Sequence, residues 1–314
     1  VERSRGLGDV YKRQLQAYLL NYFMKISETK IKFDQKKIES SYITSCSYDV
    51  QCIKPGNVNY VSGHPDTAID DFVKSYEVTS NMITLPNLSL GQRIYKCVES
   101  TREAVDTNTN LGIILLCSVF IQSLLADEKY TLCEAIKAII MDASQQDVTD
   151  VCNAISLADP GGLGSHESYD VRSRPDISLH EIMSLSSDYD QISNQYSKYF
   201  NDIFNFIIPT LHNSMSEIKD TKYAISYSFL KILEKYPDSH ITRKYGHKIA
   251  KKTSKEASDL IKILDGDTRH ESWGKNLMSL DMHFKMTRVN PGTTADLLVV
   301  SMMIYDYFIG IDNA

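Results

Sequence analysis

The sequence has few residues that interrupt helices. Its 314 residues include 8 proline and 14 glycine residues, and several of these lie together, as in Pro55-Gly56 and Pro291-Gly292. Clustered breakers are typical of turns between long helical segments. The sequence also lacks any long alternation of apolar and polar residues, the pattern expected of a half-buried strand. These two absences argue against a β-rich fold.

The sequence is equally poor in common metal and phosphate motifs. None of its six cysteines forms a CxxC pair, so neither a zinc knuckle nor a dithiol redox motif is predicted. There is no HExxH motif, and no Gly-Lys-Ser/Thr of a P-loop follows the glycine-rich segment at 160–164. Several cysteines, including Cys117, lie in apolar segments, where a free thiol packs as a small hydrophobic group. We therefore expect a cytoplasmic protein with reduced cysteines.

An excess of basic residues is also missing. The net charge is −6 and the pI is about 5.8, whereas a nucleic-acid partner usually requires a basic face. The longest apolar run, residues 111–126, is short for a membrane span and carries Ser and Gln. We expect no nucleic-acid or membrane partner and interpret this run as a buried helix. The sequence leaves the oligomeric state open.

The first fourteen residues carry a separate signal. The chain begins with Val, and residues 9–14 (DVYKRQ) match the translated end sequence of a transposase adapter used in sequencing libraries. We interpret residues 1–14 as translated adapter and residues 15–314 as one helical domain.

Apolar residues recur at helical spacing along most of the remaining chain. The segments with three- and four-residue spacing are 94–105, 111–125, 132–141, 192–207, 223–233, 249–264 and 295–307. Because mean helices run to about eleven or twelve residues, the chain is predicted to form a single all-α globular domain of about ten to twelve helices.

A turn early in the chain is suited to hold a phosphate. Lys54 supplies a cation, and Pro55 and Gly56 predict a tight turn whose backbone can approach a ligand closely, with Asn57 following. The alternative is an ordinary surface turn after a helix.

A helix start offers a second anion site. Asn108 and Thr109 precede the most apolar helix, and Gly112 in its first turn leaves room for a phosphate. The free N–H groups of a helix N-terminus attract anions. Ordinary capping is the alternative interpretation.

Two further segments carry groups for metal or proton chemistry. His64 and Asp66, one residue apart, can face one pocket, and Asp66 is a candidate Mg²⁺ ligand because Mg²⁺ prefers oxygen ligands. Asp142 and Asp147 flank a turn between two predicted helices and are further candidate metal ligands. Each of these carboxylates could instead cap a helix.

Two later segments complete the set of candidates. Gly161 and Gly162 lie in a loop whose backbone amides could face a ligand, although a flexible connector is equally compatible. His240, Arg243 and Lys244 fall at the start of a helix, where basic groups oppose the helix dipole unless an anion is bound. Surface cations are the alternative.

Taken in order, these motifs resemble those of the triphosphoribosyl-dephospho-CoA synthase family from about residue 38 to 309. The matching segments are 54–58, His64 and Asp66, Phe72 and Ser75, 108–112, Asp142-Ala143, 160–164, 238–246 and 291–297. The resemblance implies an all-helical transferase that joins C1′ of the ATP ribose to the 2′-hydroxyl of 3′-dephospho-CoA and expels adenine. ATP and 3′-dephospho-CoA are thus the implied substrates, and we expect Mg²⁺ as cofactor.

The implied reaction suggests roles for the candidates. Substitution at an anomeric carbon passes through an oxocarbenium-like state, so the site must stabilise positive charge and move protons. We predict that Lys54, Arg243 and Lys244 contact phosphates, with the glycine and asparagine segments around them. Asp66, Asp142 and Asp147 are predicted to hold Mg²⁺ or to face the cationic ribose, and His64 or His240 to carry a proton.

Three other functions stay open. Asn110 and Leu111 stand where family members tied to citrate lyase often have a basic pair, which leaves room for a different cofactor-precursor acceptor. A metal-dependent ADP-ribosyl or nucleoside hydrolase would use water in place of the acceptor. A non-catalytic nucleotide-binding helical protein would release no adenine.

Overall fold

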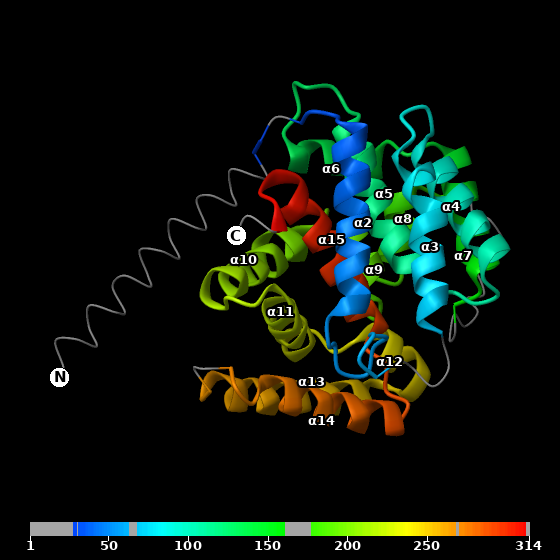
Figure 1. Ribbon diagram of the computed structural model, residues 1–314. Coiled ribbons are helices and arrows are strands. Elements are labelled where there is room, and N and C mark those ends of the chain that lie inside the picture. The colour runs from blue at the N-terminus through cyan, green and yellow to red at the C-terminus, as the bar shows by residue number, and fades with distance from the viewer. Residues whose placement is uncertain (1–27, 30, 63–67, 161–176, 268–269, 312–314) are drawn as a thin grey trace.

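The computed structural model describes residues 28–29, 31–62, 68–160, 177–267 and 270–311. Within these ranges the chain forms fourteen α-helices and no strand, gathered into one body (Figure 1). The prediction of an all-helical fold is therefore confirmed. Some predictions concern residues outside these ranges. They are the interpretation of residues 1–14 as translated adapter and the candidates His64, Asp66, Gly161 and Gly162.

The helices are α2 (Gln35–Gln51), α3 (Ile69–Ser80), α4 (Leu90–Ala104), α5 (Leu111–Leu124), α6 (Leu132–Met141), α7 (Gln145–Ala158), α8 (Leu179–Ser184), α9 (Gln191–Ser197), α10 (Ile208–Glu217), α11 (Thr221–Lys235), α12 (Ser239–Tyr245), α13 (His247–Asp265), α14 (Trp273–Met286) and α15 (Gly292–Phe308). A 3₁₀ turn (Met82–Thr84) precedes α4, and a π-helical turn (Ile203–Ile207) leads into α10.

Helices α5 and α15 form the centre of the molecule. Every residue of α5 except Gly112 and Gln122 is buried, and α15 is buried along most of its length and packs against α5 and α2. In Figure 1, α2 passes in front of these helices, and α13 and α14 run alongside each other at one end. A helix that is apolar on all sides belongs in a core, so the predicted buried helix at 111–125 is confirmed. Five of the six cysteines are likewise buried as free thiols.

Local signals at the helix starts explain where many helices begin. Helices α4, α6, α7 and α8 each open with a capping box, in which an N-cap Ser or Thr and a Gln, Glu or Asp three residues later satisfy each other's backbone N–H groups. Asp34, Asp190, Asp220 and Asp238 cap α2, α9, α11 and α12. None of the described helices is long and apolar enough to cross a membrane.

The single helix predicted at 192–207 is divided in the structure. Helix α9 ends at Ser197, and Tyr199 and Phe200 adopt left-handed backbone angles, with φ of 52° and 63°. This conformation costs roughly 1–2 kcal/mol per residue, which complete burial of the Phe200 side chain helps to offset. The apolar spacing continues through the break, so the sequence does not reveal it. Because of such breaks, the described residues form fourteen α-helices, more than the ten to twelve expected.

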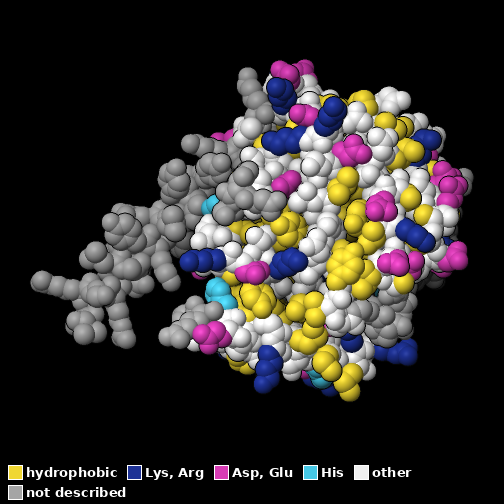
Figure 2. All heavy atoms as spheres, in the orientation of Figure 1, with side chains coloured by type: hydrophobic (Ala, Val, Ile, Leu, Met, Phe, Trp, Pro, Cys, Tyr) yellow, Lys and Arg dark blue, Asp and Glu magenta, His cyan; other side chains and the backbone are white. Residues whose placement is uncertain are grey.

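Charged side chains of both signs are interspersed over the face shown in Figure 2, with apolar side chains between them. This mixture agrees with a modest net charge of −6 for the whole chain. Charges arranged in this way favour solubility over the attraction of a polyanion to that face.

The carboxyl group of Asp238 joins two helices at their N-termini. Its Oδ1 accepts a hydrogen bond from the backbone N–H of Ile241, in α12, at 3.0 Å. Its Oδ2 accepts from both the N–H and the hydroxyl of Thr294, in α15, each at 2.8 Å. Asp238 is buried, so these donors would have no water to replace the carboxyl oxygens.

We predict that Asp238→Ala lowers the free energy of unfolding by about 3 kcal/mol, because it removes a helix cap and leaves buried donors unpaired. The exposed cap Asp220, which accepts from the N–H of Tyr223, provides a matched control. Asp220→Ala should cost about 1 kcal/mol. Urea unfolding of both variants measures the difference, and equal losses would contradict a joining role for Asp238.

Candidate active site

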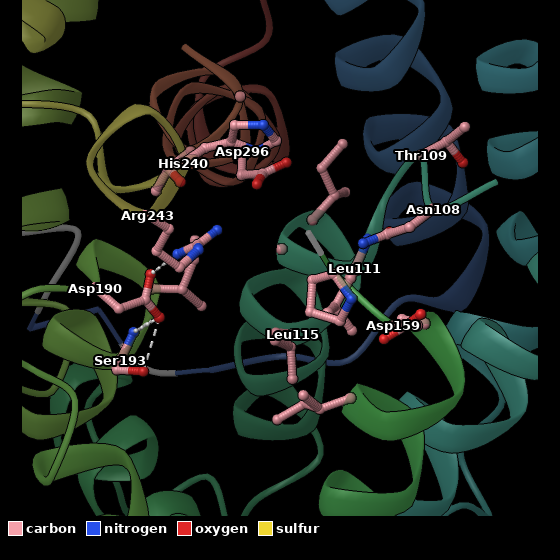
Figure 3. A pocket seen from close by; sticks show the side chains of 18 of the residues that line it. Asn108, Thr109, Leu111, Leu115, Asp159, Asp190, Ser193, His240, Arg243 and Asp296 are labelled. Carbon is pink, nitrogen blue, oxygen red and sulfur yellow. Dashed lines mark hydrogen bonds and ion pairs between the residues drawn. The ribbon is translucent and has the colours of Figure 1, made fainter. Parts of the chain in front are cut away.

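A cavity of about 850 Å³ opens among the helices (Figure 3). Its volume lies within the range of roughly 300–1,000 Å³ typical of small-molecule sites. It is lined by residues of α2, α3, α4, α5, α7, α8, α9, α12 and α15 and of the loops between them, including the loop before α5. One wall is apolar, formed by Leu111, Leu115, Val151, Ile155, Ile182, Met183 and Ile192. The polar lining includes Asp49, Asn57, Asn108, Thr109, Asp190, His240, Arg243, Asn290 and Asp296.

The start of α5 faces the cavity. Asn108 accepts a hydrogen bond from the N–H of Leu111 at 3.2 Å, and the hydroxyl of Thr109 lies 2.5 Å from that of Ser75. The space beside Gly112, which we predicted to leave room for a phosphate, is occupied by a side chain of the protein. A Cβ atom at Gly112 would lie 2.2 Å from Oδ2 of Asp296, so this glycine admits a carboxyl group of the protein itself against the helix start.

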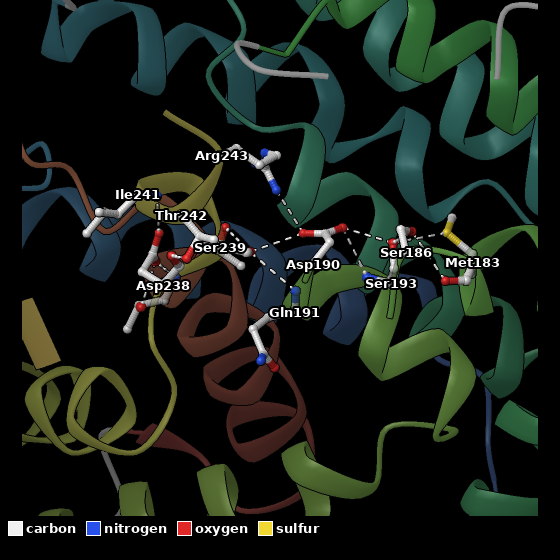
Figure 4. Close-up of polar contacts among 12 residues, drawn as sticks. Met183, Ser186, Asp190, Gln191, Ser193, Asp238, Ser239, Ile241, Thr242 and Arg243 are labelled. Atoms are coloured by element: carbon white, nitrogen blue, oxygen red, sulfur yellow. Dashed lines mark hydrogen bonds and ion pairs between the residues drawn. The ribbon is translucent and has the colours of Figure 1, made fainter. Parts of the chain in front are cut away.

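Helix α12 places His240 and Arg243 on the cavity wall. The guanidinium Nη1 of Arg243 donates to Oδ1 of Asp190 at 2.9 Å (Figure 4). Asp190 also caps α9 by accepting from Ser193, and it accepts from the hydroxyl of Ser239 at 3.1 Å. These contacts hold the cationic group of Arg243 at the cavity wall. Lys244, by contrast, is exposed and does not line the cavity.

His240 presents an imidazole that burial keeps neutral. Burial lowers the pKa of His240, Asp238 acts in the opposite direction, and Arg243 and Lys244 lower the pKa further. A neutral imidazole can accept a proton from a substrate hydroxyl. Among the described residues, no hydrogen bond engages its ring nitrogens.

The predicted turn at 54–58 is confirmed, but it presents only Asn57 to the cavity. The N–H of Asn57 donates to the carbonyl of Lys54 at 2.9 Å, and Gly56 has a φ of 81° that favours glycine. Lys54 is fully buried behind the cavity wall. Its ammonium group lies 2.5 Å from a carboxylate oxygen of Asp49 and 2.5 Å from Oδ1 of Asn57. The predicted phosphate cation is thus the counter-ion of a buried carboxylate.

Two carboxyl groups of the cavity, those of Asp49 and Asp296, were absent from the predicted site. Burial raises the pKa of Asp49, against the attraction of Lys54. Burial also raises the pKa of Asp296 well above its ordinary value, and Asp49 and Asp238 raise it further, while Lys54 and Arg243 oppose them. Asp296 lies in the first turns of a predicted helix and within the matching segment 291–297, where the sequence left a role as a ligand open beside a favourable interaction with the helix dipole. Asp49 lies within a helix and carries no local signal.

The structure does not bring Asp142 and Asp147 to the cavity. Asp142 is exposed at the C-terminal end of α6. Asp147 accepts hydrogen bonds from the N–H and hydroxyl of Ser144, the hydroxyl of Ser89 and the N–H of Gly91. Burial acts to raise the pKa of Asp147, but these bonds hold it below its ordinary value. Both carboxyl oxygens of Asp147 therefore bind groups at helix starts, one at α4 and one at α7. Helix capping was the alternative to metal binding that the sequence left open.

The predicted metal site is not assembled by the described residues. Within the described ranges, no group of three or more His, Cys, Asp or Glu side chains is placed to hold a metal ion. Asp142 and Asp147 do not fit a Mg²⁺ site within the cavity, because neither residue lines it and both oxygens of Asp147 accept hydrogen bonds from protein groups.

Comparisons with known proteins relate the chain to one family. The chain matches the family model CitG, described as ATP:dephospho-CoA triphosphoribosyl transferase, over residues 35–309. Its fold is similar to a crystal structure from Archaeoglobus fulgidus described as a candidate triphosphoribosyl-dephospho-CoA synthase, with a TM-score of 0.56 and 20% sequence identity. That similarity covers 75% of this chain and 96% of the other, and at this identity it shows the fold alone. No curated protein is significantly similar in sequence.

We predict that Arg243→Gln weakens binding of ATP about ten- to a hundredfold, the loss expected for hydrogen bonds between a cation and a phosphate. The neighbouring exposed cation Lys244 provides the control, and Lys244→Gln should change affinity less than about twofold because surface charges contribute little. Titration calorimetry with ATP measures both variants. An equal loss in the two variants would show that the charge acts at long range and not within the cavity.

Proposed function

The chain belongs to the ATP:dephospho-CoA triphosphoribosyl transferase family, and we propose that the cavity between α5, α12 and α15 is its active site. One observation carries this proposal. Candidates from three distant segments, Asn57, Asn108 with Thr109 and Gly112, and His240 with Arg243, all line the same cavity. Separate surface turns and caps, the alternative for each motif, would have no reason to converge.

The enzyme transfers the triphosphoribosyl group of ATP to dephospho-CoA. We infer that the acceptor atom is the 2′-hydroxyl oxygen of 3′-dephospho-CoA and that adenine is released. A bond forms between that oxygen and C1′ of the ATP ribose as the C1′–N9 bond breaks. The hydroxyl loses a proton and adenine gains one. Positive charge develops at C1′ in the transition state, as in glycoside chemistry.

The lining residues match these requirements. Arg243 is held at the wall by Asp190 and can bind the triphosphate, since a guanidinium suits phosphate geometry. His240 is the candidate base for the acceptor hydroxyl, because its ring is neutral and faces the cavity. The apolar wall around Leu115 and Ile155 suits the less polar parts of the two nucleotide substrates.

We also expect Mg²⁺ to accompany the triphosphate, because Mg²⁺ is usually bound by one or two carboxylates together with substrate phosphates. Of the three predicted ligands, Asp66 stays a candidate, since Asp142 is exposed outside the cavity lining and the carboxyl oxygens of Asp147 serve two helix starts. Cytoplasmic localisation likewise stays a prediction from the sequence.

Incubation of the protein with ATP, Mg²⁺ and 3′-dephospho-CoA tests the reaction, with free adenine and the mass of the adduct as readouts. We expect equal amounts of adenine and of a triphosphoribosyl adduct. The 2′-deoxy form of the acceptor should give no adduct. Adenine without an adduct would indicate hydrolysis or another acceptor, and ATP binding without adenine would indicate a binding protein.

We predict that His240→Gln lowers kcat by about 10²–10⁴-fold, the usual contribution of a general base. Protonation of His240 at low pH should abolish the wild-type activity, because a cationic ring cannot accept the hydroxyl proton. The acid limb of kcat/KM should therefore lie below the ordinary histidine pKa of about 6.5. The limb should vanish in the variant. A rate profile with an unchanged acid limb in His240→Gln would assign it to another group.

A further inference from the structure

We propose that Asp296 is the acid that protonates adenine as it leaves. This assignment rests on the proposed function, because it concerns the leaving group of that reaction. Adenine without a proton is a poor leaving group, and the site must supply that proton at the moment the C1′–N9 bond breaks.

The position of Asp296 suits a group that meets a substrate. Its side chain extends from the start of α15 into the cavity, on the wall that also carries His240 (Figure 3). Only a glycine at 112 allows this approach, since a Cβ there would lie 2.2 Å from Oδ2 and 2.6 Å from Cγ of Asp296. The absence of a side chain at position 112 therefore allows the carboxyl group of Asp296 to lie against the first turn of α5 at the cavity.

Asp296 also differs from the other acidic groups of the cavity in having no partner. Asp49 is paired with Lys54 at 2.5 Å, and Asp190 with Arg243 at 2.9 Å. Asp106 and Asp159, at the rim, are exposed to water. Among the described residues, no hydrogen bond or ion pair engages the carboxyl group of Asp296. Asp296 is half-buried, and its carboxyl group faces the cavity without a protein partner, so it is placed to meet a ligand.

The charges around Asp296 favour its protonated form. Burial is the main cause of its raised pKa, and the carboxyl groups of Asp49 in α2 and Asp238 in α12 add to it. Lys54 and Arg243 act in the opposite direction, but each is already paired with a carboxylate. The positive end of the α5 dipole likewise acts in the opposite direction, because it favours the ionised carboxylate of Asp296. The imidazole of His240 in α12 and the buried thiols of Cys46 in α2 and Cys117 in α5 are further ionisable groups on the facing helices.

The proton balance of the step closes without any further reagent. As the C1′–N9 electron pair moves to the base, the carboxyl proton of Asp296 passes to a ring nitrogen of adenine. The acceptor hydroxyl gives its proton to His240 as its oxygen bonds to C1′. Water then returns a proton to Asp296 and takes one from His240. The products are the adduct and neutral adenine.

The test compares Asp296→Asn with the wild-type enzyme on two donors. Asparagine keeps the size of the side chain but carries no acidic proton. With ATP, we expect the rate of base release to fall about 10²–10⁴-fold. With 7-methyl-ATP, whose cationic base leaves without a proton, the loss should be less than about tenfold. Asp306→Asn, at the far end of the same helix, should leave both rates unchanged.

Two results would overturn the assignment. An equal loss with both donors would show that Asp296 acts on the ribose or the fold, and a loss restored by raised Mg²⁺ would make it a metal ligand. The wild-type enzyme gives an independent check that needs no variant. Its rate should fall at high pH with ATP and stay level with 7-methyl-ATP, and a fall with both donors would contradict the proposal. Failure of the wild-type enzyme to release adenine would instead refute the proposed function.

Discussion

The buried carboxyl group of Asp238 is the contact on which the geometry of the cavity depends. One of its oxygens caps α12 and the other accepts two hydrogen bonds from Thr294 at the start of α15. His240 and Arg243 stand on the first of these helices and Asp296 on the second. A single side chain therefore sets the distance between the candidate base, the phosphate cation and the candidate acid. Such positioning matters because catalytic groups must be held within a fraction of an ångström of their working geometry.

The way charges are paired within the wall follows from the cost of burying them. An isolated ion in the interior is very unfavourable, so Lys54 is matched by Asp49 and Arg243 by Asp190. Asp296 has no such match, and burial raises the pKa of its carboxyl group, which favours the protonated form. The same physical rule thus accounts for the fixed ion pairs and for the raised pKa of Asp296.

The cavity combines this polar side with an apolar wall contributed largely by α5, α7 and α8. That division suits a reaction between two nucleotides, each with a charged phosphate part and a less polar part. It also suits a cationic transition state, because an enclosed apolar surface excludes water that would otherwise capture the ribose. The family match shows the class of enzyme, and the cavity is the site that we propose for its reaction.

The sequence by itself determined the helical segments, the turn at 54–57 and the likeness to the family, because helix spacing, breakers and motif order are local properties of the chain. It also identified Asn57, Asn108 and His240 as candidates that the cavity later brought together. Tertiary structure decided what the charged groups do. Lys54 became a counter-ion, and the left-handed break after α9 appeared only through packing. Asp49 and Asp296 act on each other across most of the length of the chain, and no local pattern records the burial that sets their protonation.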